Sequence, residues 1–249
     1  KTFTLFPLSE REFRQTESII DQPDALKQRL VFGCYPELIN IPDVSDRKDY
    51  LVDLVNSYLL KDILVYEGIR HSGKIFNLLR LLAWQTGNEV SYNELGKSLS
   101  LSKNTVEKYL DLLSKVFVIH KLEGFSRNLR KEVTKSPKWY FYDNGIRNAL
   151  IASFQPVEMR NDVGQLWENH MISERIKFQH FHHAKTNNFF WRTYDRQEVD
   201  WVEESDGNIH GYELKWSENR IKPPVAWRNA YPQAGFTLIN RENYSRWII

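Results

Sequence analysis

The chain has 249 residues, of which 41% are hydrophobic and 14% aromatic, which is enough to bury more than one core. The 34 basic residues nearly balance the 32 acidic ones, so bulk charge gives no sign of a nucleic-acid partner and any basic footprint must be local. No apolar run reaches the roughly 18 residues of a membrane helix, and no signal-peptide pattern opens the chain, so no membrane partner is expected. The single cysteine, Cys34, excludes an internal disulfide, and a cytoplasmic protein with an inert buried thiol is expected.

The first 66 residues are expected to be largely helical after a short strand at residues 3–6. Ser9 and Glu12 have the spacing of a capping box, in which each side chain satisfies a free backbone donor, and this predicts a helix that starts after Ser9. Apolar residues at helical spacing between Tyr50 and Ile63 predict a second helix over roughly residues 48–67.

Residues 75–143 have a pattern typical of a winged helix-turn-helix. Three apolar helices are expected, the first from Ile75, the second capped by Ser91 and the third capped by Ser102. Two strands, at residues 116–122 and 138–142, follow, and the basic segment at 126–138 that joins them would be the wing.

The third helix of such a unit is the one that enters a DNA major groove. Side chains from this helix and the wing are therefore predicted to contact DNA, and they are Lys103, Asn104, Lys108, Arg127, Arg130, Lys131 and Lys135. Glu107 and Asp111 put negative charge on the same helix face. A protein partner for this unit, or a solvated face, is the alternative.

The C-terminal part carries an ordered set of acids with one lysine. Glu168 lies at the margin of the apolar stripe of a helix expected over residues 164–179, and Asp200 lies in an expected strand at 196–202. The next expected strand, at 209–216, carries Glu213 and Lys215, which share one face because they are two residues apart. Such a set of oxygen ligands suits Mg²⁺, which activates water, and a lysine can orient the attacking water. A solvated cross-strand pair of Glu213 and Lys215 is the alternative.

At these residues the sequence resembles the PD-(D/E)XK, or restriction-endonuclease-like, superfamily. The resemblance implies an α/β core in which Glu168, Asp200, Glu213 and Lys215 are catalytic. It further implies that Asp200 and Glu213 bind Mg²⁺, with Glu168 completing the ligand set directly or through water, and that the substrate is a phosphodiester.

Most of the chain also resembles a bacterial and archaeal family that joins an AAA+-type ATPase core to a C-terminal domain of unknown function. The matching motifs are FPLS at residues 6–9, GCYPE at 33–37, YLLKDI at 58–63, KSPK at 135–138 and YDNG at 142–145. The resemblance implies that the ATP site, with its Walker A loop and Walker B acid, lies before residue 1 of a longer protein. Residues 68–75 have P-loop spacing, but Ile75 replaces the serine or threonine that would contact Mg²⁺, so no ATP site is expected here.

The expected architecture is multi-domain, of the α+β and α/β classes. A helical remnant of the ATPase region would occupy residues 1–70, the winged helix-turn-helix 71–150, and the restriction-endonuclease-like core 151–249. Two functions stay open: a Mg²⁺-dependent nuclease guided to DNA, and a non-catalytic DNA- or protein-binding module of an ATPase. A homo-oligomer would form through the missing ATPase core.

Overall fold

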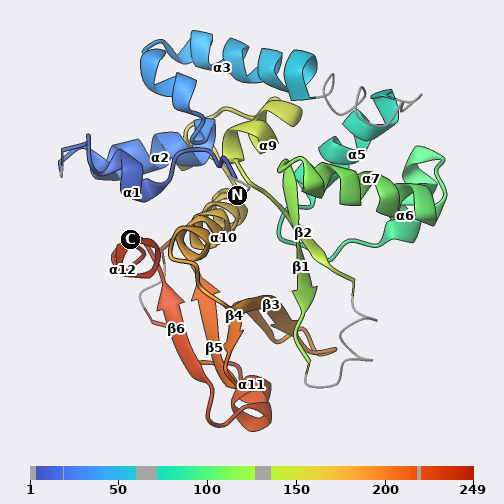
Figure 1. Cartoon of the computed structure of the whole chain (residues 1–249), viewed down its shortest axis with the longest axis vertical. Helices are drawn as coiled ribbons and strands as arrows, with labels where there is room; N and C mark the ends of the chain where they lie inside the picture. The colour runs from blue at the N-terminus through green and yellow to red at the C-terminus, as the bar shows by residue number, and fades with distance from the viewer. Residues whose placement is uncertain (1–3, 19, 60–71, 127–135, 218–219) are drawn as a thin grey trace.

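The computed structural model describes residues 4–18, 20–59, 72–126, 136–217 and 220–249 (Figure 1). Within these residues the protein has ten α-helices and one six-stranded mixed sheet, which confirms a mixed α/β fold. The strand order is β2-β1-β3-β4-β5-β6, and the pairs β1–β3 and β5–β6 are parallel while the other neighbours are antiparallel.

The sheet runs without a break from the middle of the chain to its C-terminal part. Its strands are β1 (Ile119–Gly124), β2 (Lys138–Phe141), β3 (Asn187–Arg192), β4 (Glu198–Ser205), β5 (Asn208–Leu214) and β6 (Gly235–Ile239). β1 and β2 form a hairpin, and Glu123 and Gly124 of β1 pair with Phe189 and Phe190 of β3. Strands β1 and β2, which precede the domain boundary predicted at residue 150, therefore belong to the same sheet as the strands that follow it.

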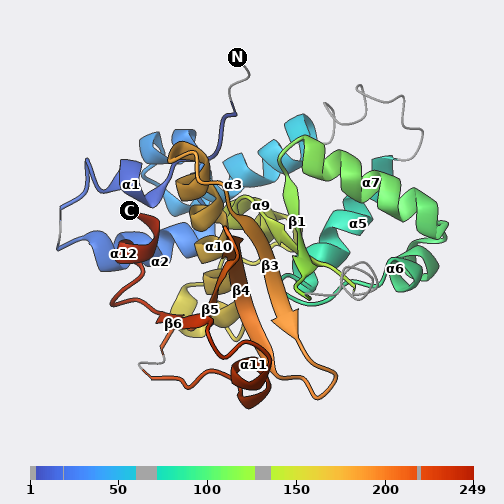
Figure 2. The same cartoon turned by 60° about the horizontal axis from the view of Figure 1, so that its bottom comes forward.

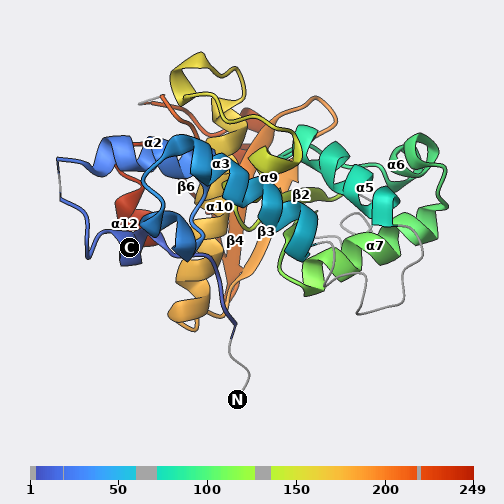
Figure 3. The same ribbon diagram turned by 90° about the horizontal axis from the view of Figure 1, so that it is seen from above.

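Helix α10 (Val163–Phe181) lies between the sheet and the helices of the N-terminal part (Figures 1 and 3). Trp167 and Met171 belong to the apolar core that it shares with β4 and β5. Because the helix is covered on several sides, its buried residues also include the polar side chains Asn169, His170, Ser173, Glu174, Lys177 and Gln179. This helix matches the prediction over residues 164–179 closely.

The N-terminal helices differ in part from expectation. The capping box at Ser9 is confirmed, because the Ser9 backbone N–H donates to Glu12 at 2.8 Å. Ser9 is the N-cap of α1 (Glu10–Phe13). The strand predicted at residues 3–6 is wrong for the described residues 4–6, which pair with no strand; the Phe6 ring packs instead against Phe117 and Tyr142. Residue 3 lies outside the described part.

Two further helices show where local patterns were insufficient. Helix α2 (Gln22–Phe32) was not predicted, although Pro23 lies in its first turn. The helix expected at 48–67 begins earlier, as α3 (Val44–Asp53), because the Asp43 side chain accepts from the backbone N–H of Ser45 at 2.7 Å. It continues as a π-helical turn, Leu54–Leu59, and residues 60–71 lie outside the described part.

The three helices predicted between residues 75 and 115 are present as α5 (Ser72–Trp84), α6 (Tyr92–Leu99) and α7 (Lys103–Lys115). Ser91 and Ser102 cap the second and third helices as predicted, each accepting a hydrogen bond from the backbone three residues on. The hairpin of β1 and β2 follows them (Figure 1), and its strand β1 lies beside α7 (Figure 2). Gly73 and Lys74 of the P-loop-like run belong to α5, and Lys74 donates to the carbonyl of Ser100 at 2.8 Å.

The turn after α2 fits closely against α9 (Asn144–Leu150). Gly33 has a φ of 79°, a backbone conformation that favours glycine. The Asp143 side chain caps α9 through Ile146 and also accepts from the backbone N–H of Cys34 at 2.6 Å. Asn148 donates to the carbonyl of Val31 at 2.7 Å, so α9 satisfies the end of α2.

The remaining helices, α11 (Val225–Ala230) and α12 (Ser245–Ile248), pack against the C-terminal strands through Trp227 and Trp247, and Pro224 directly precedes α11. Among the helices of the described ranges, none combines the length and the apolar character of a bilayer span.

Candidate active site

An open cleft of about 460 Å³ lies where the start of α10 meets the ends of β4 and β5. All four residues predicted to be catalytic line it, namely Glu168, Asp200, Glu213 and Lys215. The opposite wall comes from residues 86–88, the loop between α5 and α6, and from Lys138 of β2. We call this hollow the acidic cleft. It is built from both the middle and the C-terminal parts of the chain.

The strand pair β4–β5 positions Asp200, Glu213 and Lys215. The backbone N–H of Leu214 donates to Asp200 Oδ2 at 2.8 Å, which fixes the Asp200 carboxylate against the end of β5. Leu214 itself is buried, so Glu213 and Lys215 lie together on the other side, as strand alternation predicts. Lys215 Nζ lies 2.8 Å from Glu213 Oε1 and 3.4 Å from Asp200 Oδ2, and it therefore bridges the two carboxylates.

The bridged pair is not a surface feature. Glu213 is 8% exposed and Asp200 is 5% exposed, so the pair of Glu213 and Lys215 considered from the sequence does form, but its carboxylate is buried rather than solvated. Only Lys215 reaches solvent to a larger extent, with about one-third of its side chain exposed.

Glu168 is held by side chains that the sequence reasoning missed. The Tyr140 hydroxyl donates to Glu168 Oε1 at 2.5 Å, and Lys138 Nζ lies 3.6 Å from the same oxygen while also pairing with Glu198. Lys138 and Tyr140 are two residues apart in β2, so strand alternation could have placed them on one face. Nothing in the sequence indicated that this face meets α10.

A glycine allows the wall of the acidic cleft to approach this acid. Gly87 has a φ of 80°, and a Cβ at this position would lie 3.3 Å from Glu168 Oε1. A side chain would therefore be strained by the backbone conformation and would crowd the carboxylate.

Burial dominates the electrostatics of the acidic cleft. It raises the pKa of Glu168 to about 7, against the opposing charge of Lys138, and raises the pKa of Glu213 to about 7 with help from the charge of Asp200. Burial alone would lower the pKa of Lys215, but the carboxylates of Asp200 and Glu213 outweigh it and raise that pKa. Lys215 is thus a lasting cation beside acids that titrate near neutrality.

The residues present fit a hard divalent cation in one respect. Glu213 Oε2 is buried and has no hydrogen-bond partner among the described residues, so a carboxylate oxygen is left for a ligand. However, the ligand atoms of Glu168, Asp200 and Glu213 do not form a group of three within 4.8 Å of one another. The acids share the cleft, but Lys215 occupies the space between two of them.

The residues predicted to contact DNA are only partly visible. Lys103, Asn104 and Lys108 lie on the exposed face of α7, as expected. Asn104 and Lys108 line a hollow together with Glu107 and Asp111, so positive and negative groups are mixed there. The four residues of the expected wing, Arg127, Arg130, Lys131 and Lys135, lie outside the described residues.

The two raised pKa values predict a pH-dependent stability. A carboxyl group that titrates near 4.5 in the unfolded chain and about 7 in the folded chain binds more protons when folded. Its stabilising contribution is therefore complete below pH 4.5 and is lost as the pH rises to 7. Urea unfolding across this range, with a chelator present, measures the effect for the wild type and for the Glu168→Gln/Glu213→Gln double variant. The double variant should show a flatter dependence, and equal slopes would contradict the assignment.

The comparisons with known proteins identify a family without an assigned activity. The chain belongs to the family "Domain of unknown function (DUF8612)", whose model matches residues 23–157, more than half of the chain. The model of a second family, "Domain of unknown function (DUF4143)", matches residues 163–237, which include the four candidate catalytic residues. The two matched segments meet near the start of α10.

The curated relatives are uncharacterised proteins. One from Methanocaldococcus jannaschii is 25% identical over 214 residues, which cover 80% of this chain and 46% of the relative. One from Mycobacterium tuberculosis is 28% identical over 137 residues (54% and 30%), and one from Haemophilus influenzae is 24% identical over 157 residues (59% and 39%). The chain thus spans less than half the length of these relatives. No solved structure matches significantly.

Proposed function

We propose that the acidic cleft is a divalent-cation-dependent site that cleaves phosphodiester bonds, of the restriction-endonuclease-like kind. The observation that supports this most directly is the convergence of Glu168, Asp200, Glu213 and Lys215, from α10, β4 and β5, on one cleft. Three acids and a persistent cation in a partly desolvated hollow are the groups that this chemistry requires.

In this proposal Asp200 and Glu213 bind Mg²⁺ through their carboxylates, and Glu168 completes the ligand set directly or through water. The bound ion would lower the pKa of water and offset charge on the phosphate. Lys215, which bridges Asp200 and Glu213 at 3.4 and 2.8 Å, would exchange those contacts for the nucleophilic water or a phosphate oxygen. Lys138 and Tyr140 would hold Glu168 in place.

Incubation of supercoiled and linear DNA with the protein and Mg²⁺ or Mn²⁺ tests this function. We expect cleavage by the wild type and at least about a hundredfold loss in Asp200→Asn and Lys215→Ala, since small displacements of catalytic groups already have effects of that order. Asp195→Asn and Lys185→Ala are matched controls, because both side chains are exposed and neither lines the acidic cleft. No cleavage by the wild type, or equal cleavage by the active-site variants, would rule the proposal out.

A second function, a non-catalytic binding or assembly module, is favoured by two observations. Lys215 already pairs with both Asp200 and Glu213, and the three acids do not form a compact three-ligand group. Calorimetric titration with Mg²⁺ or Mn²⁺ separates the two functions. Heat that disappears in Asp200→Asn favours the enzyme, whereas no heat from the wild type favours the module.

We further propose that the chain is the C-terminal part of an AAA+-type ATPase and that its partner is DNA. The match to DUF4143, a domain often C-terminal to AAA-type ATPase domains, supports the first part, as does coverage of less than half of each relative. The order of three helices, of which the second and third are capped by Ser91 and Ser102, and a hairpin supports a winged helix-turn-helix that binds DNA or a protein.

Two observations would decide these points. A parental sequence with no Walker A loop upstream of Lys1 would rule out the ATPase assignment, and with it the homo-oligomer through an ATPase core. Affinity for duplex DNA that falls steeply with added salt would support the DNA partner, because phosphate contacts release counterions.

A further inference from the structure

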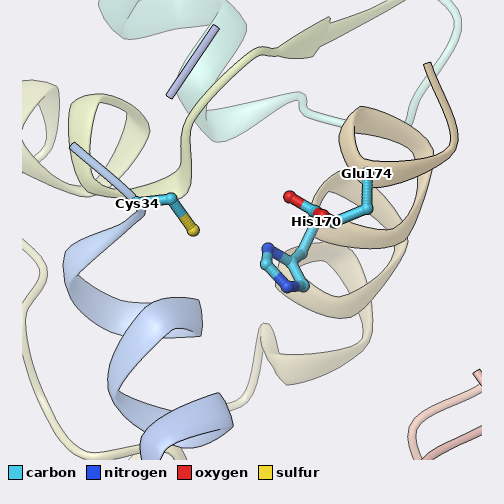
Figure 4. Close-up of side chains that lie close together, drawn as sticks. All are labelled: Cys34, His170 and Glu174. Carbon is cyan, nitrogen blue, oxygen red and sulfur yellow. The ribbon is translucent and has the colours of Figure 1, made fainter. Parts of the chain in front are cut away.

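A buried cluster of three potential metal ligands lies between the turn after α2 and the middle of α10. Ligand atoms of Cys34, His170 and Glu174 all lie within 4.8 Å of one another, and among the described residues this is the group of three that meets that limit. Figure 4 shows the sulfur, the imidazole ring and the carboxylate pointing towards one another. The three residues are between 1% and 4% exposed, and none of them lines the acidic cleft.

The neighbouring Glu10 fixes the orientation of the His170 imidazole. His170 Nε2 lies 2.9 Å from Glu10 Oε1, and Arg29 donates to both oxygens of the same carboxylate at 2.6 and 2.8 Å. Because both Glu10 oxygens accept hydrogen bonds from the guanidinium of Arg29, Glu10 is an ionised carboxylate.

A carboxylate only accepts hydrogen bonds, so Nε2 of His170 must carry the proton in this pair. In the neutral ring the lone pair is therefore on the other nitrogen, Nδ1. A histidine whose distal N–H donates to a carboxylate is the arrangement that fixes the tautomer at metal sites. Arg29 and Glu10 would thus hold His170 in the binding orientation.

The charges around the cluster favour a cation. Three carboxylates are buried there, those of Glu10, Asp143 and Glu174, whereas Arg29 and Lys177 are the two buried cations. A divalent ion that displaces the thiol proton adds one net positive charge, which balances the excess carboxylate.

The existing contacts of Glu174 leave room for such an ion. Lys177 Nζ donates to Glu174 Oε1 at 2.6 Å, and the backbone N–H of Glu10 donates to Oε2 at 2.8 Å. An ionised carboxylate has about four acceptor positions, so a metal can share an oxygen with one of these donors. The same contacts join α1 to α10, and Cys34 adds the turn after α2 to the same place.

We propose that Cys34, His170 and Glu174 form a structural site for Zn²⁺, which fastens the N-terminal segment to α10. Thiolate, imidazole and carboxylate are the three ligand types that Zn²⁺ takes in proteins, and the soft sulfur distinguishes this site from the all-oxygen acidic cleft. The fourth position belongs to water or another oxygen. The site does not depend on the proposed nuclease activity.

Co²⁺ is a suitable spectroscopic probe for this site. We expect metal-free protein to bind one equivalent of Co²⁺ with a near-ultraviolet thiolate-to-cobalt charge-transfer band, and Zn²⁺ to displace the Co²⁺ and abolish the band. Cys34 is the single cysteine of the chain, so the band can come from no other residue. Cys34→Ser should remove the band, while His183→Gln, an exposed histidine, should leave it unchanged.

Two further measurements separate ligands from supporting residues. Glu10→Gln should keep the band but weaken affinity about 10- to 100-fold, as expected for a residue that orients a ligand. Zn²⁺ should raise the thermal unfolding midpoint of the wild type and leave that of Cys34→Ser unchanged. Circular dichroism confirms that each variant is folded. A wild-type protein that binds no Co²⁺, or binds it without the thiolate band, would show that the cluster is a hydrogen-bonded network only.

Discussion

Replacing Gly145 with alanine is expected to destabilise the protein by about 3 kcal/mol or more, at the upper end of the cost of overpacking. The new methyl group would lie 2.0 Å from the backbone oxygen of Phe32 and 2.9 Å from Asp143 Oδ1. The first neighbour belongs to the main chain, so no side-chain rotation can relieve the clash. The loop after α2 and the start of α9 must separate, which also disturbs the contact of Asp143 with Cys34.

Gly164→Ala is the matched control for this variant. Gly164 is the second residue of α10, and a Cβ there would meet no atom within 4 Å. Alanine should instead stabilise the protein by about 0.5–1 kcal/mol, because an alanine loses less backbone conformational freedom than a glycine when the helix forms. Urea denaturation of both variants gives the two free energies of unfolding, and shifts of the same sign would contradict the packing described for α9.

Arg29→Ala is expected to have the second large effect, a loss of about 3–5 kcal/mol, because it leaves a buried carboxylate without its main partner. Arg29 is 5% exposed and makes two hydrogen bonds to Glu10, whose side chain is fully buried. It also pairs with Glu17 at 2.5 Å, so two acids lose a counterion at once. His170 remains as a single partner for Glu10.

The control for Arg29→Ala is Lys27→Ala, which removes a cation from exposed ion pairs. Lys27 pairs with Asp24 at 3.2 Å and with Glu158 at 3.0 Å, and both acids are largely exposed. Lys27→Ala should leave the urea midpoint unchanged within error, since solvent screens such pairs. If Arg29→Ala were equally harmless, the buried pair with Glu10 would not contribute to stability as described. Adding Glu10→Gln to Arg29→Ala should restore part of the loss, since the unpaired charge is removed.

Elements with local signals could be predicted from the sequence. Ser9, Ser91 and Ser102 were recognised as caps because a capping side chain contacts the backbone only two or three residues away. Strands β4 and β5 were recognised by alternation, and this placed Asp200, Glu213 and Lys215 at neighbouring strand ends. The acids and the lysine of the acidic cleft were therefore within reach of sequence reasoning.

The unpredicted parts depend on contacts between distant segments. Helix α2 carries no clear apolar stripe, and it is fixed by Asn148 and by the core under α10. Lys138 and Tyr140 reach Glu168 only because β1 pairs with β3, which is a non-local contact. Likewise, nothing near Cys34 in the sequence indicates His170, since the fold joins them across 136 positions of the chain. Strand register and local propensity do not indicate which distant segments of the chain come into contact.

The parallel pairing of β1 with β3 has a consequence for how a long polymer could be handled. The hairpin that follows α7 belongs to the same sheet that carries Asp200, so the helix face and the acids are joined through continuous strand pairing rather than through a linker. If α7 binds a nucleic acid and the acidic cleft cleaves it, as proposed, the distance between the bound segment and the acids would be constant. Cleavage would then occur at a set number of nucleotides from the segment bound by α7.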